Sequence, residues 1–262
     1  MSIIDPLILG LIQGLTEFLP VSSSGHLLLA ADFLGQTTND VTFDAVIHLA
    51  TLAAVIVALW TDIKKIAIGI FKKNQDGHLG WLIILATIPV LIVGFFFGDW
   101  LEETFRSPSV VAFSLAFWGI ILWLVDAQTK KTAETEINKI SFKKSFFIGL
   151  SQIIALIPGT SRSGITITTG LFSGLSREAA ARFSFLLGIP SIAAAGGFSL
   201  LKIFLNNGDF DSLSLIVAFI AAFISGFAAI KFLLQIMKGL SYKWFAIYRI
   251  ALAVVIILFV WL

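Results

Sequence analysis

The chain contains no cysteine and few charged residues. The absence of cysteine excludes disulfide bonds, thiolate metal sites and a cysteine nucleophile, and it leaves the redox compartment undetermined. Only 13% of the residues are charged, whereas a soluble domain has about 25%. Apolar residues are in excess instead: 58% are hydrophobic and the mean hydropathy is +0.97. The sequence therefore predicts an all-α integral membrane protein, a polytopic helical bundle.

The N-terminus has no basic stretch and no small-residue cleavage site after its first apolar run, so we expect that run to be retained. Six apolar segments are long enough to cross about 30 Å of hydrocarbon as helices. They lie at residues 41–60, 79–98, 108–126, 179–204, 212–237 and 244–262. We expect residues 1–262 to form a single transmembrane domain.

Four further apolar segments are short and form two adjacent pairs, 3–19 with 24–35 and 145–157 with 164–175. Each pair is interrupted by a cluster of Pro, Gly and Ser, at residues 19–25 and 157–164. Short, broken, polar-tipped segments in corresponding halves are typical of re-entrant hairpins in repeated membrane proteins. Irregular backbone at membrane depth is tolerated where it lines a protein cavity.

Basic residues predict the orientation of these segments. Fourteen of the eighteen Lys and Arg fall in four clusters, which are Lys64, Lys65, Lys72 and Lys73; Lys130, Lys131, Lys139, Lys143 and Lys144; Arg177 and Arg182; and Lys231, Lys238 and Lys243. If all four clusters are cytoplasmic, the hairpins 3–35 and 145–175 enter from opposite faces. We therefore expect two inverted repeats, approximately residues 1–126 and 140–262, each containing a re-entrant helical hairpin.

Ionisable residues near the two breaks indicate a functional site, because each costs about 2.5–3.5 kcal/mol inside a bilayer. Glu17 precedes the first break and shares a helical face with Gln13. His26 follows that break, and Arg162 lies at the second. Helix N-termini at two facing tips, with an arginine between them, favour a phosphate or diphosphate ligand.

Simpler interpretations stay open beside this one. Glu17 and Arg162 could be a structural ion pair that locks the hairpins together. Ser22, Ser23 and Ser24, and Thr160 or Ser161, could be helix caps. His48 and Asp44 are four residues apart and could form a packing pair or contribute to the cavity. Arg249 is assigned no chemistry.

Two motifs carry a resemblance to a known family. The first runs from Gln13 to His26 as QGLTEFLPVSSSGH, and the second from Pro158 to Thr166 as PGTSRSGIT. They resemble the two signatures of the undecaprenyl-diphosphate phosphatase family, also called bacitracin-resistance proteins. Their order and spacing agree with that family, and the similarity of length and hydropathy covers essentially the whole chain. Gln13 departs from the pattern, because many members have a second glutamate there.

The resemblance implies hydrolysis of a C55 isoprenyl diphosphate to the monophosphate that carries cell-wall precursors. It also implies a divalent cation, Mg or Ca, and a site facing the outer side of the bacterial cytoplasmic membrane. The expected partners are the polyprenyl diphosphate and membrane lipid, with a homodimer as a possible assembly and no nucleic acid. The expected catalytic residues are Glu17, Ser23, His26 and Arg162; the expected phosphate ligands are Gln13, Ser22, Ser161, Arg162, Ser163 and Thr166; and Glu17 is the expected metal ligand.

The residues leave the mechanism open. Ser23 is the preferred nucleophile, with His26 three residues away as its base; alternatively His26 attacks and Ser23 binds phosphate. Glu17 would bind a cation or orient His26. The competing function is a transporter or flippase for an anionic lipid, since inverted repeats with broken helices are common in transporters. A purely structural membrane protein fits the buried Glu, His and Arg poorly.

Overall fold

The computed structural model describes the chain except residues 1–2, 36–40, 130–132, 134, 206–210 and 262. The described residues form eleven α-helices and two short 3-10 helices, with no strand among them. The predicted all-α fold is therefore confirmed. Lys130 and Lys131, which we placed in a basic cluster, lie outside the described residues.

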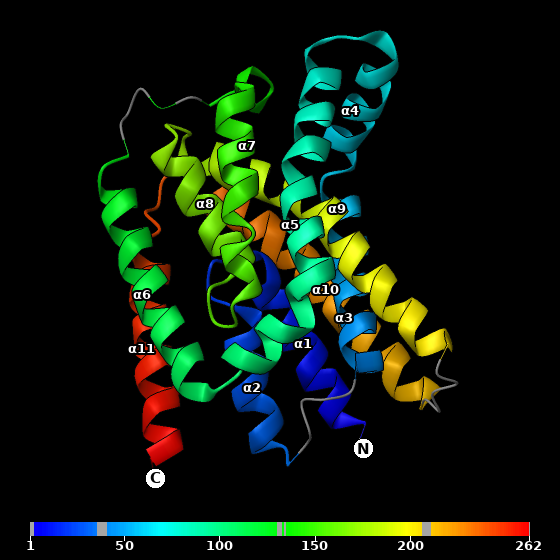
Figure 1. Ribbon diagram of the computed structural model, residues 1–262, viewed down its shortest axis with the longest axis vertical. Coiled ribbons are helices and arrows are strands. Elements are labelled where there is room, and N and C mark those ends of the chain that lie inside the picture. Colours follow the sequence, from blue (N-terminus) through cyan, green and yellow to red (C-terminus); the bar gives the residue numbers. More distant parts are fainter. Residues whose placement is uncertain (1–2, 36–40, 130–132, 134, 206–210, 262) are drawn as a thin grey trace.

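Both predicted hairpins are present, and each has its turn in the middle of the molecule (Figure 1). The first consists of α1 (Ile4–Phe18) and α2 (Ser23–Phe33), and its open end points to the lower end of the figure. The second consists of α7 (Phe142–Ser151), the 3-10 helix η2 (Ile154–Leu156) and α8 (Arg162–Phe172). Its open end points to the upper end, so the hairpins approach from opposite directions.

Four described helices are long and apolar enough to cross a membrane. They are α5 (Gln75–Phe105), α6 (Pro108–Ala127), α9 (Arg177–Leu205) and α10 (Ser212–Ile236). A bent pair, α3 (Val41–Ala58) and α4 (Trp60–Lys72), makes up to five. Helix α11 (Lys243–Trp261) covers the last predicted span, and the 3-10 helix η1 (Ile137–Lys139) precedes α7. The chain is a multi-pass membrane protein.

Helix α3 ends at Ala58, two residues before the end of the predicted span 41–60. The chain turns by 78° between α3 and α4, at Leu59. Asp62, Lys64 and Lys65 follow at once, and they make α4 a poor continuation of a membrane span. Ile63 and Ile66 pack against the main apolar core, while Phe71 is exposed. Helix α4 thus forms the upper end of the molecule together with the start of α5 (Figure 1).

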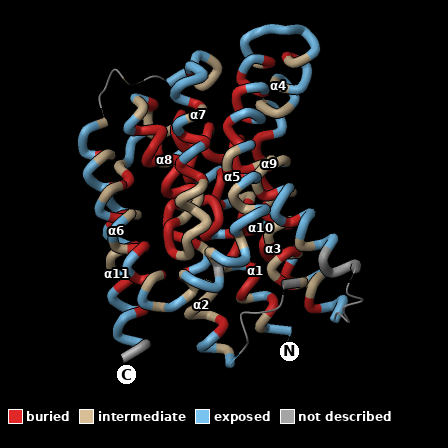
Figure 2. Tube along the Cα trace, in the orientation of Figure 1, coloured by how far each residue is buried: buried red, intermediate tan, exposed pale blue. Residues whose placement is uncertain are grey.

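Small residues let the first helix of each hairpin approach a long helix closely. A Cβ atom on Gly14 of α1 would lie 2.3 Å from the Ala222 carbonyl oxygen of α10. A Cβ atom on Gly149 of α7 would lie 2.1 Å from the Ala86 carbonyl oxygen of α5. Such glycine contacts are typical of helix pairs in membranes. Buried residues are concentrated in the middle and exposed residues on the outside (Figure 2).

The two hairpin tips have the same unusual backbone. Ser22 has φ 70° and ψ 105°, and Ser161, 139 positions later, has φ 71° and ψ 112°. Non-glycine residues rarely adopt positive φ, at a cost of about 1–3 kcal/mol. Gln13 and Gln152 are separated by the same 139 positions, as are Gly25 and Gly164. This correspondence agrees with an internal repeat; the division into repeats 1–126 and 140–262 stays a prediction.

Candidate functional site

The two hairpin tips are in direct contact in the middle of the bundle. The backbone N–H of Gly159 donates a hydrogen bond to Ser24 Oγ (3.2 Å). In the opposite direction, Ser163 Oγ donates to the Leu19 carbonyl oxygen (3.0 Å). Helices α2 and α8 both begin at these tips, so their N-terminal ends lie at the junction. Helix N-termini provide free N–H groups and a positive dipole end, which together favour an anion.

Glu17 is the centre of the polar contacts at this junction. Its side chain is 9% exposed, and Arg162 Nη2 lies 3.0 Å from its Oε1 atom. Its other oxygen, Oε2, accepts hydrogen bonds from Ser23 Oγ and Gln13 Nε2, both at 3.1 Å. The Glu17 carboxylate therefore connects Gln13 and Ser23 of the first motif to Arg162 of the second.

Arg162 is held between two helices. Besides Glu17 on α1, its guanidinium donates to the Ser184 carbonyl oxygen of α9 (3.3 Å). Gly188 lies on the same helix, and a Cβ atom there would be 2.3 Å from Arg162 Nη1. The missing side chain at this position is therefore what makes room for the guanidinium. Arg162 keeps 15% of its side chain exposed, so it is close to the surface of the site.

The remaining hydroxyl groups of the two motifs are mostly engaged by the protein. Ser161 Oγ caps α8 by accepting from the Gly164 N–H (3.1 Å), and it also contacts Ser163 Oγ (3.2 Å). Thr166 is buried, donates to the Arg162 carbonyl oxygen (2.8 Å) and contacts Ser184 Oγ (2.7 Å). These groups position α8 and its arginine.

At the first tip, the Ser22 and Ser24 hydroxyls share a hydrogen bond (3.0 Å), and Ser22 makes no side-chain cap to α2. Ser23 is the hydroxyl of this tip that faces the Glu17 carboxylate. Capping accordingly accounts for Ser161 but not for the three serines of the first motif.

His26 has different partners from those that the sequence suggested. Its Nδ1 atom lies 2.7 Å from the Ser22 carbonyl oxygen, and its Nε2 atom lies 2.7 Å from the hydroxyl of Tyr248 on α11. Both ring nitrogens are thus occupied, and the hydroxyl of Ser23 bonds Glu17 instead. The structure brings Glu17, Ser23 and Arg162 together and holds His26 against α11.

Two residues of α11 belong to this site although neither was predicted to have a role in it. Tyr248 bonds His26, and its neighbour Arg249 is fully buried. The Arg249 guanidinium donates to carbonyl oxygens of both tips, at Pro20 (3.5 Å), Gly159 (3.2 Å) and Thr160 (2.8 Å), and of α6, at Ser114 and Leu115. The signal available in the sequence was an arginine inside an otherwise apolar span.

His48 lies on α3. Its Nδ1 atom donates to the backbone carbonyl oxygen of Asp44 (2.7 Å). The predicted contact between these two residues therefore exists, and it runs through the backbone of Asp44.

The oxygen atoms of Glu17 and Gln13 suit a hard cation that takes most of its ligands from water and from the substrate's phosphates. Among the described residues, no three of His, Asp and Glu are grouped as a metal site. Gln13 Oε1 is buried and finds no hydrogen-bond donor in that part of the chain. Mg²⁺ commonly takes one or two protein oxygens together with water and phosphate oxygens. Glu17 and the Gln13 amide oxygen fit that limited role.

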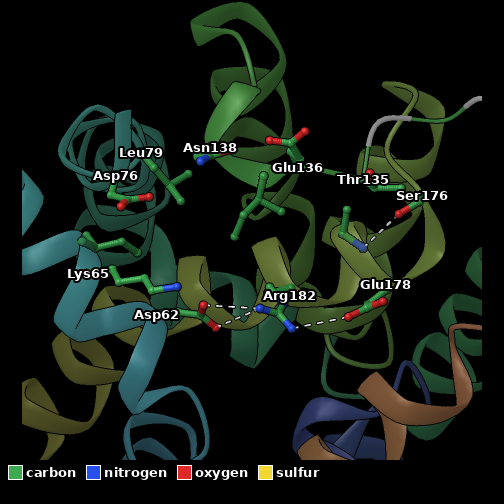
Figure 3. Close-up of a pocket in the computed structure, with 13 residues that line it drawn as sticks. Asp62, Lys65, Asp76, Leu79, Thr135, Glu136, Asn138, Ser176, Glu178 and Arg182 are labelled. Carbon is green, nitrogen blue, oxygen red and sulfur yellow. Dashed lines mark hydrogen bonds and ion pairs between the residues drawn. The ribbon is translucent and has the colours of Figure 1, made fainter. Parts of the chain in front are cut away.

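A polar cavity of about 350 Å³ lies away from the tips and is lined by residues of α4, α5 and α9 (Figure 3). Arg182, Asp62 and Glu178 of its lining are already paired. Arg182 lies 3.3 Å from both carboxylate oxygens of Asp62 and 3.4 Å from Glu178 Oε1. None of the predicted site residues lines this cavity, so the candidate site remains the junction of the tips.

Comparison with known proteins extends the similarity over the whole chain. The family model described as bacitracin resistance protein BacA matches residues 6–255. A protein of Caldicellulosiruptor bescii named undecaprenyl-diphosphatase is 44% identical, over 99% of this chain and 98% of its own. Proteins of the same name from Alteromonas mediterranea and Moorella thermoacetica are each 41% identical, over 99% and 100% of this chain and 99% of their own.

Proposed function

Because the chain belongs to the bacitracin resistance protein BacA family, we propose that it is an integral membrane undecaprenyl-diphosphatase. It hydrolyses undecaprenyl diphosphate to the monophosphate and inorganic phosphate. The monophosphate is the lipid carrier of cell-wall synthesis, and its recycling confers bacitracin resistance. The relatives' name, undecaprenyl-diphosphatase, does not favour the transporter alternative.

The observation that supports this reaction best is the carboxylate of Glu17, shared between Ser23 and Arg162 across the two tips. Phosphoryl transfer needs positioning and electrostatic stabilisation of the equatorial oxygens more than covalent chemistry. In the proposed complex, the terminal phosphate lies at the N-terminal ends of α2 and α8. Arg162 binds its oxygens, and the fork of the guanidinium suits two of them at once.

In the proposed mechanism, Ser23 attacks the terminal phosphorus. Its hydroxyl proton passes to Glu17, with which it already shares a hydrogen bond, and a bond forms between Ser23 Oγ and phosphorus. The bond from that phosphorus to the bridging oxygen breaks, and the polyprenyl monophosphate leaves with the electron pair. Water then attacks the phosphorus of the phosphoserine, the bond between Ser23 Oγ and phosphorus breaks, and Glu17 returns its proton to Ser23 Oγ. Inorganic phosphate leaves with the oxygen of the water.

Glu17 is a better base for Ser23 than His26 in this arrangement. A general base must be within hydrogen-bond reach of the proton that it removes. Glu17 Oε2 is 3.1 Å from Ser23 Oγ, whereas the ring nitrogens of His26 bond Ser22 and Tyr248. The same occupancy argues against His26 as the attacking group.

A divalent cation, Mg or Ca, is part of the proposal. Glu17 and the amide oxygen of Gln13 would hold it, and when bound it would neutralise charge on the diphosphate. The other residues act on the substrate directly: Arg162 binds phosphate oxygens, and Ser23 supplies the nucleophile.

We place the protein in the bacterial cytoplasmic membrane, with the site open to the outer side. Helices α4 and α7, which carry Lys64, Lys65, Lys143 and Lys144, lie at the end of the molecule opposite the open end of the first hairpin (Figure 1). The positive-inside rule assigns the lysine-rich end to the cytoplasm. A homodimer stays a prediction.

The test is phosphate release from undecaprenyl diphosphate by the purified protein in detergent. An enzyme works without a sealed compartment, whereas a transporter needs one. We expect turnover in wild type and its loss in Arg162→Ala. A protein that releases no phosphate in detergent, but carries an anionic lipid across liposomes only when Arg162 is intact, would refute the proposal.

A further inference from the structure

Tyr248 and His26 are joined by two independent contacts although they come from α11 and α2. The Tyr248 hydroxyl lies 2.7 Å from His26 Nε2. The two rings are stacked, with centroids 5.5 Å apart and planes inclined by 9°. Both the position of the imidazole and the direction of one of its nitrogens are therefore set by this tyrosine.

The second nitrogen of His26 fixes which tautomer is present. Nδ1 lies 2.7 Å from a backbone carbonyl oxygen, that of Ser22, and a carbonyl oxygen can only accept. Nδ1 must therefore carry a proton. In the neutral ring the lone pair is then on Nε2, where the Tyr248 hydroxyl donates to it. His26 is thus held by an acceptor on one side and by a donor on the other.

Tyr248 is itself anchored to the site through the next residue. The Arg249 guanidinium donates to the carbonyl oxygens of Pro20 in the first tip and of Gly159 and Thr160 in the second. Because adjacent residues share a backbone, the tyrosine has a fixed place relative to both tips. The segment Tyr248-Arg249 connects α11 to the reacting groups.

The two tyrosines of the chain differ in a way that argues for a functional contact. Tyr242 is fully buried, and its hydroxyl donates to the Arg177 carbonyl oxygen (3.1 Å), as a buried hydroxyl requires. Tyr248 is 47% exposed. Its hydroxyl bonds a titratable side chain of the site rather than a backbone carbonyl oxygen.

Resting on the proposed function, we infer that Tyr248 is a positioning residue for the phosphatase reaction. The Ser22 carbonyl oxygen sets the proton on Nδ1, and Tyr248 donates to Nε2 and so keeps that atom directed toward α11. Tyr248 therefore determines where the His26 ring lies at the tip that carries Ser23. Deprotonation of Ser23 remains with Glu17.

The first test reads the tautomer directly and needs no turnover. Protein labelled with ¹⁵N-histidine contains three imidazoles, those of His26, His48 and His78, and His26→Gln assigns the signal of interest. We expect Nδ1 to be protonated and Nε2 to show the shift of a hydrogen-bonded acceptor. Tyr248→Phe should move the Nε2 signal toward that of a free lone pair. A proton on Nε2 in the wild-type protein, or an unchanged signal in Tyr248→Phe, would overturn the inference.

The second test connects the contact to turnover. Tyr248→Phe should lower kcat at least about tenfold, with KM within about twofold, because the change releases the His26 ring from its position at the first tip without removing a phosphate ligand. In a His26→Gln background the same change should cost little more, since the two residues act as a unit. Full turnover in Tyr248→Phe, or an equal additional loss in that background, would overturn the inference.

Tyr242→Phe is the matched control. It removes the hydroxyl of the other tyrosine and one buried hydrogen bond, so thermal stability should fall while the His26 signal and kcat stay unchanged. If the wild-type protein released no phosphate at all, the proposed function would fail. The tautomer measurement would still decide whether Tyr248 positions His26.

Discussion

Glu17 and Arg162 are 145 residues apart in the sequence and 3.0 Å apart in the structure, as the ion pair that joins the two hairpin tips. The pair alone would serve stability as well as catalysis, because buried charges need partners. Ser23 and Gln13 favour a catalytic role over a purely stabilising one, since both donate to the Glu17 carboxylate. A purely structural pair has no need of a nucleophilic hydroxyl on its carboxylate.

Glu17→Gln tests the carboxylate as a base. The amide keeps the shape of the side chain but cannot take the proton of Ser23, so kcat should fall by about 10²–10⁴-fold. Leaving Arg162 without its counter-charge should also lower stability, by about 3–5 kcal/mol. Phosphate release and thermal unfolding, measured on the same preparation, separate the two effects. Turnover within about tenfold of wild type in a folded Glu17→Gln protein would rule out the base.

Ser23→Ala tests the nucleophile. Loss of the attacking group should reduce kcat by far more than tenfold while substrate binding is kept. Acid quenching with labelled substrate should trap phosphate on Ser23 in the wild-type protein. The matched control is Ser24→Ala in the same tip, whose hydroxyl accepts from the Gly159 N–H. It should cost stability, about 1–3 kcal/mol for an unsatisfied buried donor, and should leave the phosphoserine detectable.

Arg249 should be essential for the contact between the tips. Arg249→Met removes a buried guanidinium from carbonyl oxygens of Pro20, Gly159 and Thr160 and leaves them without that donor. Hydrogen bonds from charged groups contribute about 1.5–3 kcal/mol each, so the melting temperature in detergent should fall strongly. Unfolding at the wild-type temperature would show that the tips do not depend on this residue.

Close packing of the second hairpin makes a further prediction. In Gly149→Ala the new methyl group would lie 2.1 Å from the Ala86 carbonyl oxygen, so α7 must move away from α5. Overpacking of this kind costs about 1–3 kcal/mol. Gly98→Ala on α5 is the control, because nothing lies within 4 Å of the added methyl group. It should leave stability unchanged or raise it slightly, through the higher helix propensity of alanine. Equal effects of the two changes would contradict the packing.

The hairpins and most of their polar tips could be predicted because their signals are local. Clusters of Pro, Gly and Ser at residues 19–25 and 157–164 interrupt apolar runs, and Glu17 and Arg162 stand out in them. The bend of 78° after Ala58 could not be predicted, since the apolar run continues through it. The partner of His26 could not be predicted either. Tyr248 is 222 residues away and half exposed, so it looks like any aromatic residue of a membrane span.

The sequence spacing was also misleading at Ser23. Residues three apart share a helical face, which favoured His26 as its partner. In the structure α2 begins at Ser23, and the side chain of this first residue reaches across the tip to Glu17 on α1. Spacing along α2 cannot predict this contact, because Glu17 lies on α1, before the turn.

Gln13 offers a test of the divalent cation. Its amide nitrogen donates to Glu17, and its buried Oε1 atom has no donor among the described residues. Gln13→Glu places a second carboxylate beside Glu17 and should strengthen binding of a hard cation. After removal of metal with a chelator, the Mg²⁺ or Ca²⁺ concentration needed for half-maximal phosphate release should fall, by about tenfold or more. Gln152→Glu, at the corresponding position of the second hairpin, places the added carboxylate beside Ser191 of α9 and should not change that concentration. An unchanged metal requirement in Gln13→Glu would mean that the cation is bound elsewhere, and Glu17 would then act on Ser23 and Arg162 alone.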